Sequence, residues 1–133
     1  MRDIKFKAWL KDHKVMEFVM NLDLLNGGAL VTADFSGNYG SSRIFAFKDI
    51  ELMQYTGLKD KNGVEIYEGD VVVPFEPTKN GRHEMPVIWL ANTGMWSLDA
   101  GYHGHYGLLS RFTDGVTCCS CEVIGNIHDK EQT

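Results

Sequence analysis

The sequence has few cysteines and no long apolar run. Its three cysteines are crowded into residues 118–121, whereas a disulfide framework spreads an even number of cysteines along the chain. No apolar run approaches the roughly 20 residues of a membrane-spanning helix. The first residues alternate charged with apolar side chains, unlike a signal peptide. We therefore expect one soluble domain over residues 1–133, kept in the cytoplasm with its thiols reduced.

Basic residues are scarce too. The 13 Lys and Arg residues are outnumbered by 18 Asp and Glu, which argues against a general nucleic-acid-binding protein, because such proteins usually carry excess positive charge. The first 14 residues are the exception, since Arg2, Lys5 and Lys7 lie near Trp9, a possible stacking ring. A nucleic-acid-binding β-barrel is therefore an alternative hypothesis, although a solvated outer face explains the lysines equally well.

The motifs of common enzyme classes are missing as well. The sequence has no Gly-rich phosphate loop leading into a helix and no Gly-x-Ser-x-Gly nucleophile motif. We therefore expect a protein that has no catalytic activity and needs no cofactor.

Residues 103–121 contain two histidines and all three cysteines of the sequence, namely His103, His105, Cys118, Cys119 and Cys121. Zinc favours such ligands, but the paired cysteines of zinc sites are usually about two to four residues apart, and these cysteines are closer. A cysteine nucleophile with one of the two histidines as its base matches no motif. We expect buried or partly buried thiols and no metal, and a metal- or thiol-dependent enzyme is the third hypothesis.

The sequence does contain short strand patterns separated by turn residues. Residues 4–9 alternate apolar and polar side chains, and residues 15–20 can return as the second strand of an N-terminal hairpin. Further strand patterns lie at residues 44–54, 71–75, 87–91, 95–99 and 121–128. Gly94, late in a short linker, indicates a hairpin with a bulge between two of them, and Gly125 indicates a bulge in the last.

Other segments favour turns and loops. Asp60 and Gly63 predict a tight reversal, because an Asp accepts backbone N–H bonds at the start of a turn and Gly tolerates positive φ. Residues 26–42 are rich in Gly, Ser, Asn and Asp and predict a long surface connection. We interpret residues 101–107 as an aromatic, His-rich loop. Together these patterns predict a mainly β fold: a small, partly closed antiparallel barrel of the SH3-like type, with an N-terminal hairpin and little helix.

Residues 52–72, LMQYTGLKDKNGVEIYEGDVV, resemble the signature of the YopX family. Two further segments are similar to that family, RDIKFKAW at residues 2–9 and CEVIGNIH at residues 121–128. The resemblance spans almost the whole length and implies a phage or prophage protein of the bacterial host cytoplasm, a mainly β fold and no established catalytic activity. It provides no catalytic residues to carry over, and residues 26–42 and 101–106 depart from the family pattern.

The signature stretch has two interpretations. It could form a recognition surface, since its two adjacent turns mix aromatic anchors with charges. The residues of this surface would be Tyr55, Lys59, Asp60, Tyr67, Glu68 and Asp70. The structural interpretation is that its glycines satisfy turn geometry, its apolar residues fill the core, and Asp60 and Asp70 cap turns. The function that we expect is binding to another protein or to copies of itself, because small β domains often cover their strand edges by pairing.

Overall fold

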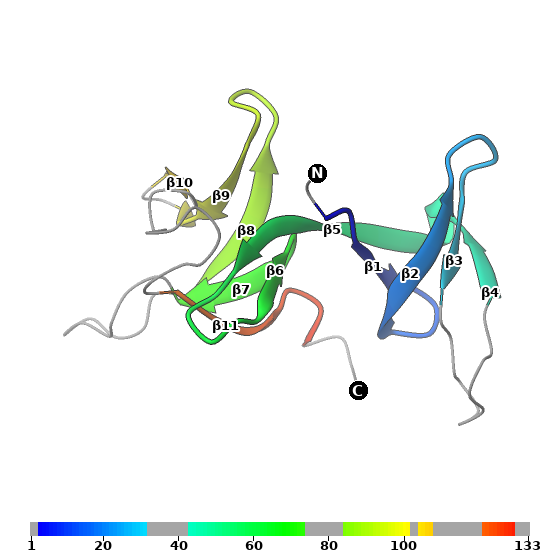
Figure 1. Cartoon of the computed structure of the whole chain (residues 1–133), viewed down its shortest axis with the longest axis horizontal. Helices are drawn as coiled ribbons and strands as arrows, with labels where there is room; N and C mark the ends of the chain where they lie inside the picture. Colours follow the sequence, from blue (N-terminus) through cyan, green and yellow to red (C-terminus); the bar gives the residue numbers. More distant parts are fainter. Residues whose placement is uncertain (1–2, 32–42, 74–83, 102–103, 108–120, 130–133) are drawn as a thin grey trace. The chain divides into compact units, whose positions relative to one another are not determined.

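The structure is a computed structural model of the chain that describes residues 3–31, 43–73, 84–101, 104–107 and 121–129. These residues form antiparallel β-strands and one short 3-10 helix (Figure 1). The chain divides into two compact units. The N-terminal unit is built around Lys5–Gln54, and the C-terminal unit around Tyr55–Asp129.

The N-terminal unit is an open antiparallel sheet with strand order β4-β3-β2-β1-β5. Its elements are β1 (Phe6–Leu10), β2 (Val15–Asp23), β3 (Gly28–Val31), β4 (Arg43–Ala46), the 3-10 helix η1 (Phe47–Asp49) and the first half of β5 (Ile50–Lys59). Because side chains alternate between the faces of a strand, residues spaced two apart share a face, and one face of this sheet is its inner face. That inner face carries the buried core of Ala8, Leu10, Ala29, Val31 and Ile50. We call the opposite side the outer face.

The C-terminal unit contains the second sheet, with strand order β10-β9-β8-β7-β11. The strands of the C-terminal unit, besides the second half of β5, are β6 (Glu65–Tyr67), β7 (Asp70–Val73), β8 (Met85–Leu90), β9 (Met95–Asp99), β10 (His105–Gly107) and β11 (Glu122–Asn126). Strand β6 pairs with the second half of β5. The buried core of this unit consists of Leu58, Ile66, Val72, Met85, Val87, Leu98 and Cys121.

Strand β5 serves both units, because its first half pairs with β1 and its second half with β6 (Figure 1). The register of the β5–β6 pair shifts between Tyr55 and Lys59. Within that shift Gly57 adopts a φ of 86°, a conformation that favours glycine. The hydroxyl of buried Thr56 donates to the carbonyl of Ile66 (2.8 Å) and accepts from the N–H of Leu58 (3.2 Å), so the irregular backbone stays hydrogen-bonded.

Asp60 is fully buried and joins two distant parts of the C-terminal unit. Its Oδ1 accepts the backbone N–H groups of Asn62 (2.8 Å) and Val64 (2.9 Å), which closes the turn between β5 and β6. Its Oδ2 accepts the N–H of Val123 in β11 (2.9 Å), 63 residues along the chain. One carboxylate therefore shapes a local turn and attaches the last strand to it.

Asp70 plays a similar part at the next turn. Its Oδ2 accepts the N–H of Tyr67 across the bend at Gly69 (2.8 Å), and its Oδ1 accepts from the side-chain amide of Asn126 (3.2 Å). Gly69 itself donates to the carbonyl of Val87 and accepts from the N–H of Ile127. The two buried carboxylates thus hold both turns of residues 52–72 against residues 121–128.

The predicted fold class is confirmed: the protein is mainly β and antiparallel, with an N-terminal hairpin (β1–β2) and little helix. Both sheets are open among the described residues, so the term partly closed barrel applies only loosely. The predicted hairpin of β8 and β9 and the bulge at Gly125 are also confirmed. The expectation of one domain over residues 1–133 stays a prediction. The chain divides into two compact units, but strand β5 pairs with strands of both. No described helix is long and apolar enough to cross a membrane.

Two loop predictions were wrong. Residues 26–42 contain strand β3, which forms because Ala29 and Val31 alternate with Leu30 and bury their side chains in the core. The remainder of that segment, residues 32–42, lies outside the described residues. Residues 101–107 contain strand β10, which pairs with β9 from His105 to Gly107. In both cases pairing with a neighbouring strand outweighs the local loop-like composition.

We expect Asp60→Ala to lower the free energy of unfolding by about 3 kcal/mol, because three backbone N–H groups lose the carboxylate that accepts from them. Asp60→Asn keeps an acceptor at one oxygen and should cost only about half as much. Urea unfolding followed by tryptophan fluorescence measures both. The control is Asp99→Ala, because Asp99 accepts one exposed N–H, that of Gly101, and its loss should cost less than about 1 kcal/mol. An Asp60→Ala variant no less stable than Asp99→Ala would contradict this role.

Candidate functional site

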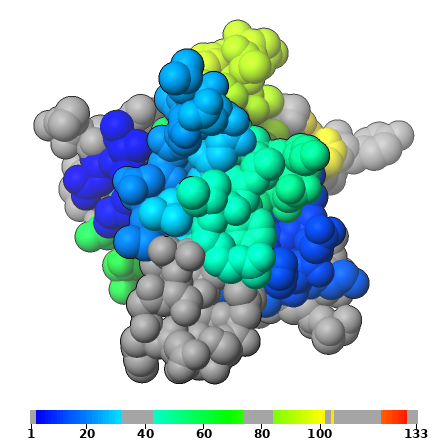
Figure 2. All heavy atoms as spheres, turned by 90° about the vertical axis from the view of Figure 1, so that its right-hand side faces the viewer, coloured from blue at the N-terminus to red at the C-terminus, as the bar shows by residue number. Residues whose placement is uncertain are grey.

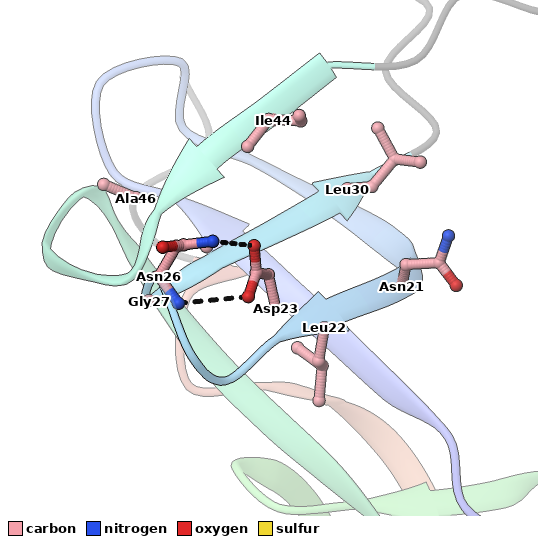
Figure 3. Close-up of a pocket in the computed structure, with 9 residues that line it drawn as sticks. Asn21, Leu22, Asp23, Asn26, Gly27, Leu30, Ile44 and Ala46 are labelled. Atoms are coloured by element: carbon pink, nitrogen blue, oxygen red, sulfur yellow. Dashed lines mark hydrogen bonds between the residues drawn. The ribbon is translucent and has the colours of Figure 1, made fainter.

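The outer face of the N-terminal unit has a hollow of about 370 Å³ over strands β2, β3 and β4. It is lined by Asn21, Leu22, Asp23, Asn26, Gly27, Gly28, Leu30, Ile44 and Ala46. Figure 3 shows Leu30 and Ile44 pointing to the same side of the sheet, whereas Leu22 points to the other side, where it joins the core. The hollow is therefore a feature of the outer face.

Small residues create this hollow. Gly28 and Ala46 are directly opposite each other on β3 and β4, and the next outer-face pair is Leu30 and Ile44. The first pair leaves space and the second supplies apolar walls. A Cβ built on Gly28 would lie 3.4 Å from Cγ2 of Ile44 and 3.4 Å from the carbonyl oxygen of Phe45, so a larger residue would crowd the site.

The turn between β2 and β3 closes one end of the hollow (Figure 3). Asn26 donates its backbone N–H to Oδ1 of Asp23 (3.0 Å) and its side-chain amide to Oδ2 (2.8 Å). Gly27, with a φ of 73°, donates its N–H to the carbonyl of Asp23 (2.8 Å). The amide of Asn26 and then its backbone N–H lower the pKa of the Asp23 carboxyl below its ordinary value.

Exposed apolar side chains lie on the strands and the turn that form the hollow. On this unit the largest are Phe18, Met20, Leu24, Leu25 and Ile44, which are 58%, 57%, 79%, 93% and 77% exposed. Figure 2 shows the surface formed by β3 and β4, whose strands pair side by side. We call these five residues and the hollow the apolar surface. A cluster of exposed apolar residues around a hollow is a common feature of interaction sites.

The chemistry of the apolar surface suits binding. Asp23 is the charged residue that lines the hollow, and its carboxylate oxygens already accept hydrogen bonds from Asn26. The other lining side chains are apolar or neutral amides. Among the described residues no group of three or more His, Cys, Asp and Glu side chains is placed to hold a metal ion. An apolar group from a partner fits this lining better than a charged ligand does.

The predicted recognition surface has a different location from the apolar surface, because all its residues belong to the C-terminal unit. Tyr55 and Tyr67 are cross-strand neighbours with ring centroids 5.4 Å apart, and both are buried. Asp60 and Asp70 are buried in the turns described above. These four side chains are therefore closed to a partner in this structure, as the structural interpretation expects.

The other two residues of that predicted surface differ in exposure. Lys59 is exposed and Glu68 is half-buried. In the strand register Lys59 is opposite Glu65, not opposite another member of the predicted set. The structure thus brings together the two tyrosines but does not present the six residues as one exposed patch.

The residues of the nucleic-acid alternative, Arg2, Lys5, Lys7 and Trp9, are not all exposed either. Lys5 is exposed and Lys7 half-buried, with Nζ of Lys7 5.4 Å from the ring centroid of Phe18. Trp9 is only 3% exposed, between Met16 and Glu51 on the neighbouring strands, so its ring is not available for stacking on a base. Arg2 lies outside the described residues.

The thiol and imidazole set is described only in part. Cys121 is buried in the core of the C-terminal unit, which agrees with the expected buried thiols. His105 begins strand β10. His103, Cys118 and Cys119 lie outside the described residues, so the absence of a metal site and of a cysteine nucleophile stays a prediction.

The interpretation of residues 26–42 as a loop concealed the apolar surface. A signal was present, because Asp23 followed by Asn26-Gly27-Gly28 is a typical hairpin turn sequence, and residues 28–31 alternate after it. The high exposure of Leu24 and Leu25 follows from their place in that turn, which the sequence pattern did not reveal.

Comparison with known proteins identifies the family. The model of the family described as "YopX protein" matches residues 5–132, nearly the whole chain. The chain belongs to the YopX family. Both units of the YopX fold described above fall within the matched range, as do both buried carboxylates.

A solved structure supports the assignment of this YopX chain. The crystal structure of protein EF1440 from Enterococcus faecalis is similar with a TM-score of 0.61 and 30% sequence identity, over 99% of this chain and 98% of that chain. Among curated proteins none is significantly similar to this chain.

We expect Asn26→Ala to raise the pKa of Asp23 toward its ordinary value, because the variant removes the side-chain donor that is the largest cause of the lowered pKa. An NMR titration of the carboxyl carbon measures this shift. With a lowered folded pKa, Asp23 stabilises the turn at pH values above its unfolded pKa, and this effect is lost as the pH falls through the folded pKa. Asn21→Ala, which also removes an amide from the hollow, should leave the Asp23 pKa unchanged. Equal shifts in the two variants would contradict the assignment.

Proposed function

We propose that this YopX-family protein is a phage- or prophage-encoded accessory protein of the bacterial host cytoplasm, and that it acts by binding protein rather than by catalysis. The apolar surface of the N-terminal unit is its binding site. The single observation that carries the binding proposal is the high exposure of large apolar residues on the strands and the turn that form the hollow.

The charge distribution supports this choice of surface. Residues 5–54 contain six Lys and Arg residues and six Asp and Glu residues. The N-terminal unit is therefore close to neutral, and the net charge of −5 belongs to the rest of the chain. A neutral unit with exposed apolar side chains favours association with protein surfaces over binding to phosphate backbones.

Burial of such side chains supplies free energy on a useful scale. Removing apolar surface from water contributes about 25 cal/mol per Å², and a few well-placed side chains carry most of the affinity of a typical interface. Leu24 and Leu25 are suited to this role, because they are at the exposed turn and are not part of the core. The similarity to a protein of the bacterium Enterococcus faecalis supports the bacterial setting, while the phage or prophage origin rests on the family resemblance.

We expect the tagged protein to retain a partner protein from a bacterial lysate after nuclease treatment at physiological salt. The purified partner should bind the Leu24→Ser/Leu25→Ser variant at least about tenfold more weakly, as measured by calorimetry, because two apolar side chains are no longer buried.

The matched control is Val64→Ser/Ile127→Ser, which removes two exposed apolar side chains of the C-terminal unit and should bind normally. Equal losses in the two double variants would contradict the role of the apolar surface. Retained material that disappears with nuclease would contradict protein binding and favour the nucleic-acid alternative.

A further inference from the structure

Strand β4 forms an edge of its sheet, since the strand order begins with β4 and its described neighbour is β3. In an antiparallel pair, residues alternate between those whose backbone groups face the neighbouring strand and those whose groups face away. Phe47 donates its N–H to the carbonyl of Gly27 (2.9 Å), which extends the β3–β4 ladder by one step. By alternation Phe45 faces β3, whereas Ile44 and Ala46 direct their N–H and C=O groups away from the sheet.

Among the described residues this edge lacks most of the usual protection. Proteins block edge strands with proline, inward charges or bulges, or keep them very short. β4 has no proline and its register with β3 is regular, and its one charged residue, Arg43, is at its start. The strand is only four residues long, so added pairing would be local and would depend on the side chains beside it.

The spacing of the outward groups suits a second copy of β4. If two copies pair antiparallel about a two-fold axis with Phe45 opposite Phe45, Ile44 of each copy lies opposite Ala46 of the other. All outward N–H and C=O groups of Ile44 and Ala46 are then used. This register also keeps the outer faces of both copies on the same side of the joined sheet, because paired residues share a face.

The side chains fit the same register. Ile44 and Ala46 both line the hollow, so the pairing places a large side chain beside a small one and joins the hollows of the two copies. The net charge of the N-terminal unit also permits this pairing, because two neutral units approach each other without net repulsion. On the inner face the two Phe45 rings become neighbours across the axis, an arrangement that stabilises antiparallel pairs.

We infer that β4 pairs with β4 of a second copy of this chain, which makes a continuous antiparallel sheet through two N-terminal units. The inference goes beyond the proposed function, because it concerns the edge of β4 and leaves the outer faces of both copies exposed. A two-fold pairing of this kind closes on itself and gives a dimer with no further open β4 edge.

Ala46→Pro tests the pairing sharply. Ala46 has a φ of −66° and a ψ of 147°, which proline adopts without strain. Its N–H faces away from β3, so proline removes a donor needed only by the second copy. Sedimentation equilibrium should show the wild-type protein as a dimer of twice 15.0 kDa. Ala46→Pro should weaken dimerisation about 30-fold or more, since each dimer loses two donors. Ala46→Ser, which keeps the N–H and a small side chain, should dimerise like the wild type.

A second measurement does not depend on any variant. In the dimer the amide protons of Ile44 and Ala46 should exchange slowly with solvent, and dilution should make their exchange fast, while the amide of Phe45 stays protected by β3. A protein that is monomeric at every concentration, or a dimer that survives Ala46→Pro, would overturn the inference. So would a monomer whose captured partner is lost with Ala46→Pro, because β4 would then receive a foreign strand.

The failure of this inference differs from failure of the proposed function. A monomeric protein that still needs Leu24 and Leu25 for its partner overturns β4 pairing and leaves the binding proposal in place. A dimer that depends on Ala46, in a protein that retains no other partner, supports the pairing and overturns the proposal of a separate partner.

Discussion

The C-terminal unit depends on the buried carboxylate of Asp60. It accepts two N–H groups from its own turn and a third from β11. Hydrogen bonds to a buried charge are among the stronger ones in proteins, and a buried charge without them is costly. The turn, the last strand and the core between them are therefore mutually dependent. Asp70 repeats the arrangement with Tyr67 and Asn126, so the family signature is explained by structure before any appeal to binding.

Local patterns predicted the local parts of the fold. The Asp60 turn, the β8–β9 hairpin and the Gly125 bulge are set by neighbours in sequence, and all three are present. Strand β3 was missed because its pairing with β4 is decided by a tertiary arrangement, which outweighs a Gly-rich composition. The predicted recognition surface includes Tyr55 and Tyr67, and sequence alone does not reveal that these two side chains are buried. The same holds for Trp9, whose face follows from alternation but whose burial does not.

The two units have different physical characters. Buried carboxylates and turn glycines dominate the C-terminal unit, which carries the excess negative charge, whereas the N-terminal unit is neutral and leaves large apolar side chains in contact with water. This contrast separates residues that maintain the fold from residues available to a partner. The family resemblance falls mostly on the first group, which is why it gave a fold and a name but no mechanism.

The hydrogen bond between Asp60 and Val123 also orders events during synthesis. The N-terminal sheet has all its strands once residue 54 has left the ribosome, so it can form while the rest of the chain is still being translated. Asp60 emerges soon afterwards, but its third donor is 63 residues further along. The C-terminal unit can therefore complete its folding only when nearly the whole chain has been synthesised. Until then its acidic residues keep the nascent segment solvated.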